Sequence, residues 1–140
     1  MNIAFFLTPK HEVVCENLNS SMRQALERME YHSYTAIPLI DEKGRYVGTL
    51  TEGDLLWKLK NTPDLNFKNS SKVKISDIPR RMVNKAVSIN ADIENLISLA
   101  VTQNFVPVID DEGIFIGIIK RSDIINYCYN KMMKCEVSNC

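Results

Sequence analysis

Residues 35–56 read TAIPLIDEKGRYVGTLTEGDLL, and a closely similar pattern recurs 69 residues further along the chain. Placing Pro38 on Pro107 also places Gly48 on Gly117 and Asp54 on Asp123 without a gap. A shared order of proline, glycine and aspartate over such a length is the mark of a repeat. The chain is therefore an internal duplication.

Each copy contains two short apolar runs separated by an acidic turn that ends in glycine. The turns occupy residues 41–44 (DEKG) and 110–113 (DDEG). An aspartate at the first turn position can accept hydrogen bonds from the backbone, and a glycine at the last position tolerates positive φ. The pattern predicts a β-hairpin in each copy. A short amphipathic helix is expected after each hairpin, beginning near Asp54 or Asp123.

A second helix is expected before each hairpin. Residues 22–29 and 93–100 each carry four apolar side chains at positions i, i+3, i+4 and i+7, which places them on one helix face. Small polar residues that can accept from the first helical N–H groups precede both segments. The candidate caps are Ser20 or Ser21 in the first copy and Asn90 or Asp92 in the second.

Size and composition indicate one cooperative globular module. The chain has 140 residues, of which 45% are hydrophobic and 24% charged, and each half alone is of marginal size for folding. Seventeen basic and seventeen acidic residues leave the chain without the net positive charge that general nucleic-acid binding requires.

The apolar run at residues 3–7 is too short for a signal peptide or a membrane span, so a cytoplasmic protein without membrane association is expected. The expected parts are repeat 1 (1–60), a connector (61–72), repeat 2 (73–130) and a C-terminal tail (131–140).

The sequence offers no catalytic constellation. His11 and His32 lack neighbours at metal-ligand spacing, and the four cysteines form no Cys-x-x-Cys pair. No serine or cysteine is paired with an acid–base partner. We therefore expect neither an enzyme nor a catalytic cofactor or metal.

Residues 48–54 (GTLTEGD) lead a strand into a helix N-terminus, where free N–H groups favour an anion. The Thr51 hydroxyl can bond a phosphate there, and the Asp54 carboxylate can accept from ribose hydroxyls. The alternative is a capping box, in which both side chains satisfy the helix end. The Arg80-Arg81 pair is likewise open between a solvated pair and a phosphate clamp.

The tandem order of lead-in segment, amphipathic helix, apolar-Pro hairpin and Gly-apolar-apolar-Thr-x-x-Asp helix start resembles a pair of CBS domains, the modules named after cystathionine β-synthase. The resemblance covers residues 1–130 and is closest to stand-alone bacterial proteins. It implies a mixed α+β fold of two βαββα repeats packed around a pseudo-twofold axis. It also implies two clefts that bind adenosine derivatives such as AMP, ATP or S-adenosylmethionine.

The resemblance implies which residues line the clefts. The first copy departs from the family at Thr49, and the second has Lys120 where serine or threonine is usual. Lys120 either adds charge for a polyphosphate or cyclic dinucleotide or points to solvent, so the second cleft is expected to need extra phosphate charge or to be vacant. The first cleft would comprise Thr49, Thr51, Asp54, Lys85, Ala86, Asn104, Phe105 and Val106. The second would comprise Ile118, Lys120, Asp123, Thr8, Lys10, Val14, Tyr34, Thr35 and Ala36.

By this resemblance the chain is a regulatory module that senses an adenosine nucleotide and acts on an unidentified partner protein in trans. Residues 34–38 are similar to the same passage in small bacterial CBS pairs that sense cyclic di-AMP, so this dinucleotide stands beside AMP and ATP as a candidate ligand. Apolar outer helix faces favour a homodimer. The alternative function is a structural dimerisation module with no physiological ligand.

Overall fold

The computed structural model describes residues 2–137. The chain forms two compact units, and these do not coincide with the halves of the sequence. Unit 1 contains Met1–Val13 and Lys85–Cys140, and unit 2 contains Val14–Asn84. The N-terminal residues thus fold with the second repeat.

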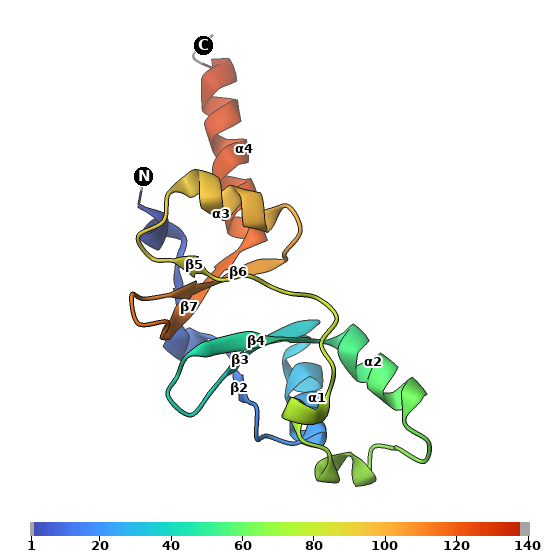
Figure 1. Cartoon of the computed structure of the whole chain (residues 1–140). Helices are drawn as coiled ribbons and strands as arrows, with labels where there is room; N and C mark the ends of the chain where they lie inside the picture. Colours follow the sequence, from blue (N-terminus) through green and yellow to red (C-terminus); the bar gives the residue numbers. More distant parts are fainter. Residues whose placement is uncertain (1, 138–140) are drawn as a thin grey trace. The chain divides into compact units, whose positions relative to one another are not determined.

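Unit 2 is a three-stranded sheet with two helices (Figure 1). The strand order is β2-β3-β4, with β2 parallel to β3 and β3 antiparallel to β4. Two short 3-10 helices follow the second α-helix. The elements are β2 (Glu16–Asn17), α1 (Met22–His32), β3 (Ala36–Ile40), β4 (Tyr46–Thr51), α2 (Glu52–Asn61), η3 (Asn69–Lys72) and η4 (Ile75–Asp77).

Unit 1 repeats this arrangement and adds a strand from the N-terminus. Its sheet order is β1-β7-β6-β5, in which β5 is parallel to β6 and the other pairs are antiparallel. Each repeat therefore has the strand, helix, strand, strand, helix order that the sequence predicts. The elements are η1 (Ile3–Phe6), β1 (Thr8–Pro9), η2 (Lys10–Glu12), β5 (Val87–Ser88), α3 (Ile93–Ala100), β6 (Phe105–Ile109), β7 (Phe115–Lys120) and α4 (Arg121–Val137).

The hairpin turns form as expected. Asp41 Oδ1 accepts from the N–H groups of Lys43 and Arg45 at 2.9 Å each. Asp110 Oδ1 makes the same two bonds in the second turn, at 2.9 Å each. The closing glycines have φ values of 81° and 82°, which a residue with a side chain adopts only at a cost. The backbone N–H of Arg45 is the main cause of a lowered pKa at Asp41.

Both helices that precede the hairpins bury most of the predicted apolar face, although Ile97 of α3 is 40% exposed. Ser21 caps α1 in a capping box with Gln24, and Asp92 caps α3, so the sequence contained both caps among its candidates. Met22, Ala25 and Met29 of α1 lie in the core of unit 2. The second helix contributes Leu96 and Ala100 to a separate core in unit 1.

The expected C-terminal tail continues helix α4 as far as Val137. Residues 138–140 lie outside the described part of the chain. The N-terminal stretch alternates between 3-10 turns and the two-residue strand β1. The connector contains the 3-10 helix η3, and its Phe67 ring lies 4.7 Å from the guanidinium carbon of Arg23.

The backbone of β1 comes unusually close to Gly117 of β7. Pro9 pairs with Gly117 across the sheet, and a Cβ atom at Gly117 would collide with the carbonyl oxygen of Thr8. Gly117 also has a φ of 156°, which side chains rarely allow. This glycine is therefore what lets the N-terminal segment complete the sheet of unit 1.

We predict that Gly117→Ala lowers the free energy of unfolding by about 3 kcal/mol, because backbone strain and steric overlap with β1 add together. Gly113→Ala is the matched control, since Gly113 also has positive φ but no atom lies within 4 Å of the point that its Cβ would occupy. We expect it to lose only about 1 kcal/mol. Urea denaturation of both variants measures the difference, and equal losses would show that the approach of β1 contributes nothing.

Candidate functional site

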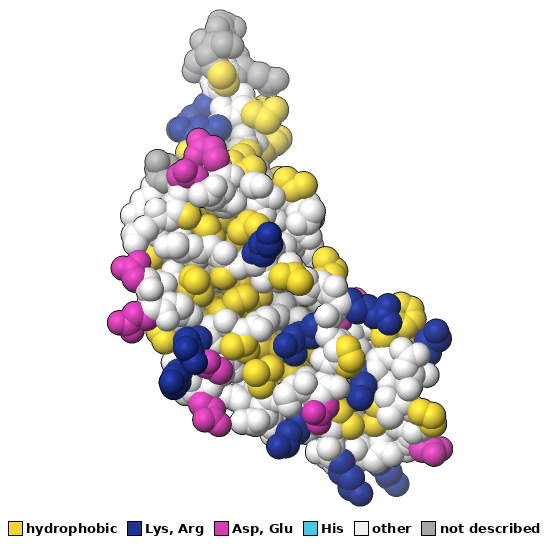
Figure 2. All heavy atoms as spheres, in the orientation of Figure 1, with side chains coloured by type: hydrophobic (Ala, Val, Ile, Leu, Met, Phe, Trp, Pro, Cys, Tyr) yellow, Lys and Arg dark blue, Asp and Glu magenta, His cyan; other side chains and the backbone are white. Residues whose placement is uncertain are grey.

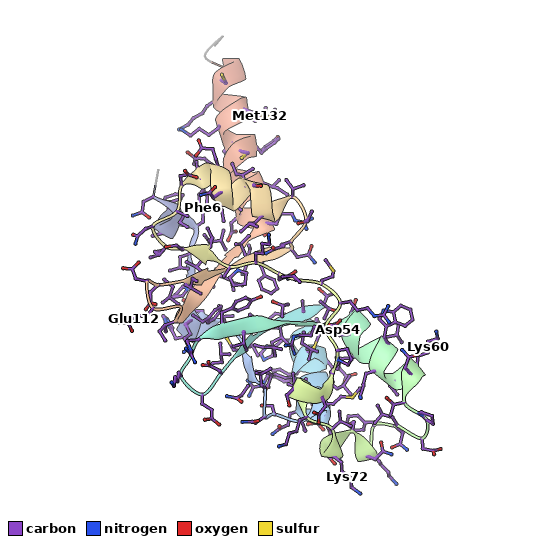
Figure 3. All side chains as sticks on the ribbon, in the orientation of Figure 1. Phe6, Asp54, Lys60, Lys72, Glu112 and Met132 are labelled. Atoms are coloured by element: carbon purple, nitrogen blue, oxygen red, sulfur yellow. The ribbon has the colours of Figure 1, made fainter. Side chains whose placement is uncertain are left out.

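The end of β4 and the start of α2 form the capping box, which is one of the two alternatives that the sequence leaves open. Thr51 is the N-cap, and its hydroxyl accepts from the Asp54 N–H at 3.1 Å. Asp54 Oδ2 accepts in return from the Thr51 N–H at 3.0 Å. Both side chains that were predicted to contact a nucleotide thus bond the helix end. Figure 3 shows Asp54 at the start of α2.

Asp54 makes a further bond that a capping box does not require. Its Oδ1 accepts from the backbone N–H of Arg81 at 3.1 Å, and the residue is only 3% exposed. The Arg81 guanidinium lies over the Trp57 ring, with 5.2 Å between its central carbon and the ring centroid. Residues 79–84, which we call the strap, are therefore held against the start of α2.

A pocket of about 610 Å³ lies between β4 and the strap. The Tyr46 hydroxyl lies 2.8 Å from the Thr49 hydroxyl and donates to the Asn84 carbonyl at 2.7 Å. The Arg80 side chain lies over Gly48, where its Nε is 3.0 Å from the position of an added Cβ. The polar groups around this space are thus the Arg80 cation, the Asp77 carboxylate, the Asn84 amide and the hydroxyls of Tyr46, Thr49 and Ser76. Its lining comprises Tyr46, Val47, Gly48, Thr49, Ser76, Asp77, Ile78, Pro79, Arg80, Met82, Val83 and Asn84.

Burial raises the pKa of Tyr46, and this rise is partly opposed by the hydrogen bond with Thr49 and by the charge of Arg80. The phenol is therefore protonated at neutral pH and can donate to Asn84. A raised folded-state pKa contributes stability that is present below the unfolded pKa near 10 and is lost at higher pH. The tie between Tyr46 and the strap should accordingly persist at all physiological pH values.

Unit 1 presents its own version of this site with a more accessible carboxylate. Thr8 of β1 pairs with Ile118 of β7, so two residues predicted for one cleft are neighbours. Asp123 and Thr8 line a pocket of about 440 Å³ that is also bordered by Tyr127. Within the described residues the Asp123 carboxylate has no hydrogen bond or ion pair, and the Lys120 side chain has no oxygen that could accept from the Asp123 N–H as Thr51 does from Asp54. Lys120 itself is exposed.

Most of the other predicted residues of the first repeat lie in unit 2 with the rest of that repeat, whereas Lys10 folds with unit 1. Thr35 O accepts from Glu52 N at 2.9 Å, and Ala36 pairs with Thr51 in the sheet. Tyr34 and Thr35 line a different pocket, on α1 and α2. Val14 packs against the core of unit 2, and Lys10 is exposed in η2.

The corresponding residues of unit 1 repeat this geometry. Asn104 O accepts from Arg121 N at 2.9 Å, and Phe105 and Val106 pair with Lys120 and Ile119. Ala86, which is half-buried, and Lys85 precede β5 in the same unit. The grouping of residues from both repeats into two clefts stays a prediction.

Sequence reasoning did not identify Gln103, which is 4% exposed. Its Oε1 accepts from Lys85 N at 2.9 Å, and its Nε2 donates to Lys85 O at 3.0 Å. The Lys85 N–H is therefore engaged, while its carbonyl oxygen keeps a second lone pair. Tyr46, Arg80 and Asn84 were also absent from the predicted site, although the Arg80-Arg81 pair had been noted as a possible clamp.

The described chain contains no cluster of three or more His, Cys, Asp or Glu side chains suited to a metal ion. Among the helices of residues 2–137, none combines the length and apolar character needed to cross a membrane.

Comparison with known proteins agrees with this architecture. The family model of the CBS domain matches the chain twice, at residues 6–61 and 75–130. The chain belongs to the CBS-domain family. The two matches account for the duplication, the paired hairpins and the two helix starts described above, and they make the chain a tandem CBS pair.

The relatives show the same fold at low sequence identity. An uncharacterised protein of Methanopyrus kandleri is 24% identical over 119 residues, which cover 83% of this chain but only 58% of that protein, so this CBS pair spans little more than half the length of that relative. A CBS-domain protein of Streptococcus pneumoniae superposes with a TM-score of 0.80 at 26% identity, covering 91% of this chain and 86% of the other.

Two further solved structures contain nucleotides. CbpB of Listeria monocytogenes, in complex with cyclic di-AMP, gives a TM-score of 0.81 at 18% identity, with 95% and 98% of the two chains covered. CBSX2 in complex with AMP gives a TM-score of 0.72 at 23% identity, with 94% and 98% covered. At these identities the likeness shows the fold alone.

We predict that Asp54→Asn lowers the free energy of unfolding by about 1–3 kcal/mol. An amide has one oxygen, so either the Thr51 or the Arg81 N–H is left facing an NH₂ group. Asp92→Asn is the matched control, because Asp92 caps α3 by a single bond to Asn95 N and asparagine caps equally well. Chemical denaturation should show a loss at position 54 and almost none at position 92. Equal values would mean that the Arg81 bond does not contribute.

Proposed function

We propose that this CBS pair is a non-enzymatic regulatory module that senses an adenosine-containing nucleotide in the cytoplasm and acts on a partner protein in trans. The candidate ligands are AMP, ATP and cyclic di-AMP. CBS proteins of the same fold occur in complex with cyclic di-AMP and with AMP, which supports a nucleotide of this class. The resemblance at residues 34–38 favours the dinucleotide, while the threonine and aspartate at the α2 start suit a mononucleotide.

The observation that carries this proposal is the chemistry around the pocket of unit 2. The Arg80 guanidinium in this pocket favours phosphate, and the Tyr46 and Thr49 hydroxyls can bond a sugar or a base. The N-terminus of α2 does not line the pocket, but it is joined to the strap by the bond from Arg81 N–H to Asp54. Asp54 is the nearby group suited to accept from two vicinal hydroxyls. In unit 1, Asp123 and Thr8 offer a carboxylate and a hydroxyl in a pocket between the start of α4 and the N-terminal segment.

Ligand binding at Asp54 would compete with the strap. Asp54 Oδ1 already accepts from Arg81 N, so ribose hydroxyls that take this oxygen displace the strap backbone from the start of α2. The strap residues Met82 and Val83, which are 56% and 82% exposed, would then move with it. Nucleotide binding would thereby alter the surface to which a partner protein binds.

The protein would act as a homodimer, as its apolar helix faces favour. The alternative function is a structural dimerisation module without a ligand. One observation favours this alternative, because the Asp54 carboxylate is already satisfied by Thr51 and Arg81 and needs no further partner.

A thermal-shift panel with AMP, ADP, ATP, S-adenosylmethionine and cyclic di-AMP tests the nucleotide proposal. A ligand at about 100 times its dissociation constant should add about 2.7 kcal/mol to the stability of the fold. The Thr49→Val and Arg80→Gln variants should reduce the response to the active nucleotide. Absence of a shift with every nucleotide would leave the structural dimerisation module as the function.

Strap displacement predicts faster amide hydrogen exchange at Arg81 when the active nucleotide is bound, because its N–H loses the Asp54 acceptor. Lys85 is the matched control, since its N–H is likewise bonded to a side-chain oxygen, that of Gln103. NMR-detected exchange with and without nucleotide resolves the two amides. Slower exchange at Arg81 would mean that the ligand reinforces the strap and does not displace it.

A further inference from the structure

The single tryptophan of the chain, Trp57 on α2, contacts two cations at the surface of unit 2. The Arg81 guanidinium carbon lies 5.2 Å from the centroid of the indole ring, and Lys60 Nζ lies 5.7 Å from it. Trp57 is 38% exposed, and both cations are exposed. Figure 3 labels Lys60 on α2, and Figure 2 shows Lys and Arg side chains gathered with hydrophobic ones over this helix. We call Trp57, Lys60 and Arg81 the basic patch.

The side-chain donors of the basic patch have no partner in the described part of the chain. Neither Lys60 nor Arg81 forms an ion pair among residues 2–137, because Arg81 bonds Asp54 through its backbone N–H. The indole N–H of Trp57 likewise has no acceptor there. It lies beside Gly53, which has no side chain to cover it, since a Cβ added at that residue would be 4.0 Å from the indole nitrogen. The patch therefore offers several unengaged N–H donors to an anion.

The second repeat shows that the fold does not need these residues. When the repeats are aligned on their prolines, Trp57 corresponds to Asn126 and Lys60 to Tyr129. Helix α4 forms with an amide and a phenol at these positions, as α2 forms with an indole and an ammonium. The aromatic ring and its cations therefore occupy surface positions whose identity the fold leaves open, and their grouping calls for another explanation.

We propose that the basic patch is the docking surface for an acidic segment of the partner protein. This inference rests on the proposed action on a partner in trans, and it names the surface and the chemistry that this surface recognises. Carboxylates can accept together from the guanidinium, the ammonium and the indole N–H, and charge-assisted hydrogen bonds are the stronger class. Tryptophan and arginine are also enriched among the side chains that contribute most to the binding free energy of protein interfaces.

The basic patch is separate from the candidate nucleotide site and from the pocket on α1 and α2. None of its three residues lines the pocket between β4 and the strap. Trp57 and Lys60 share one face of α2, at i and i+3, whereas Leu55 lines the pocket on α1 and α2 from another face. The patch is nevertheless joined to Asp54 through the backbone of Arg81. A nucleotide that releases the strap would therefore also move Arg81 away from Trp57.

Single-stranded nucleic acid is the other polyanion that an aromatic residue flanked by cations can bind. Bases stack on an accessible aromatic face, and in the basic patch Arg81 already lies over the ring. The chain as a whole has no net charge, whereas affinity for nucleic acid depends on neutralising many phosphates. Carboxylates need only the N–H donors of the patch and no ring face, so an acidic protein segment fits better.

Intrinsic fluorescence tests the proposal directly, because Trp57 is the only tryptophan of the chain. The probe is a synthetic peptide of glutamate and leucine titrated into the full chain, and the control peptide has glutamine in place of glutamate. We expect a saturable change in Trp57 emission with the acidic peptide alone. No change with the acidic peptide, or an equal change with the glutamine peptide, would overturn the proposal. Tighter binding of oligothymidylate than of the acidic peptide would also overturn it, in favour of nucleic acid.

Matched removal of single charges locates the binding on the patch. Lys131 Nζ lies 5.5 Å from the Tyr127 ring in the other repeat, a contact like that of Lys60 with Trp57. We expect the affinity for the acidic peptide to fall about tenfold in Arg81→Gln and about threefold in Lys60→Gln, and to stay unchanged in Lys131→Gln. Equal losses in the two lysine variants would mean that the peptide responds to overall charge, and would overturn the assignment. Circular dichroism confirms that the variants are folded.

The nucleotide panel distinguishes a failure of this surface from a failure of the proposed sensor. Lys60→Gln should keep the thermal shift with the active nucleotide, because Lys60 does not line the pocket beside the strap. Binding of the acidic peptide by a chain that responds to no nucleotide would support the docking surface and overturn the sensor. A nucleotide response without peptide binding would support the sensor and overturn the docking surface.

Discussion

The buried carboxylate of Asp54 constrains everything around the candidate site of unit 2. A buried carboxylate destabilises a fold unless it is paired or hydrogen-bonded. In the described part of the chain no cation forms an ion pair with it, and two backbone N–H groups satisfy it instead. One of these fixes the first turn of α2, and the other fixes the path of the strap. Because Arg81 is anchored there, Arg80 reaches Gly48 and Asn84 reaches the Tyr46 hydroxyl.

The duplication shows two versions of this arrangement. Both hairpins have the same register shift after the fourth residue of their first strand, and both have glycines at the same two positions. In unit 2 the helix start holds Thr51, whose hydroxyl completes the cap with Asp54. In unit 1 the equivalent residue is Lys120, whose side chain cannot accept from the Asp123 N–H, and within the described residues the Asp123 carboxylate has no hydrogen bond or ion pair. The two repeats thus differ both at the N-cap and in how their carboxylates are engaged.

Much of the fold followed from periodicity and turn chemistry. The turns at Asp41 and Asp110 and the caps at Ser21 and Asp92 depend on contacts within four residues, which sequence patterns can reveal. The destination of β1 depends instead on a pairing between Thr8 and Ile118, which are far apart in sequence. A local sequence pattern does not reveal which distant strand a segment pairs with, and by position alone the N-terminal segment belongs to repeat 1. Only the family resemblance grouped Thr8 with Ile118.

The candidate site was predictable to a similar extent. Thr51 and Asp54 were recognised because strand, glycine and cap lie within seven residues. The roles of Arg80, Arg81 and Gln103 were not recognised, because each acts on a residue at least 18 positions away, and two of these contacts use a backbone group that no side-chain motif encodes. A buried glutamine such as Gln103 also looks, in sequence, like an ordinary polar loop residue.

The hydrogen bond between Asp54 and Arg81 would determine how strongly a ligand binds at this site and how far its binding moves the strap. A net hydrogen bond to a charged acceptor stabilises by about 1.5–3 kcal/mol, so a strap held by the Arg81 bond would be released only about 1–10% of the time. A ligand that needs the released strap would bind about 10- to 100-fold more weakly than its intrinsic affinity. Binding of such a ligand can change the equilibrium between the held and the released strap by the same factor. A strap without this bond would give tighter binding but almost no response, so the Asp54 to Arg81 contact favours a switch over a permanently occupied site.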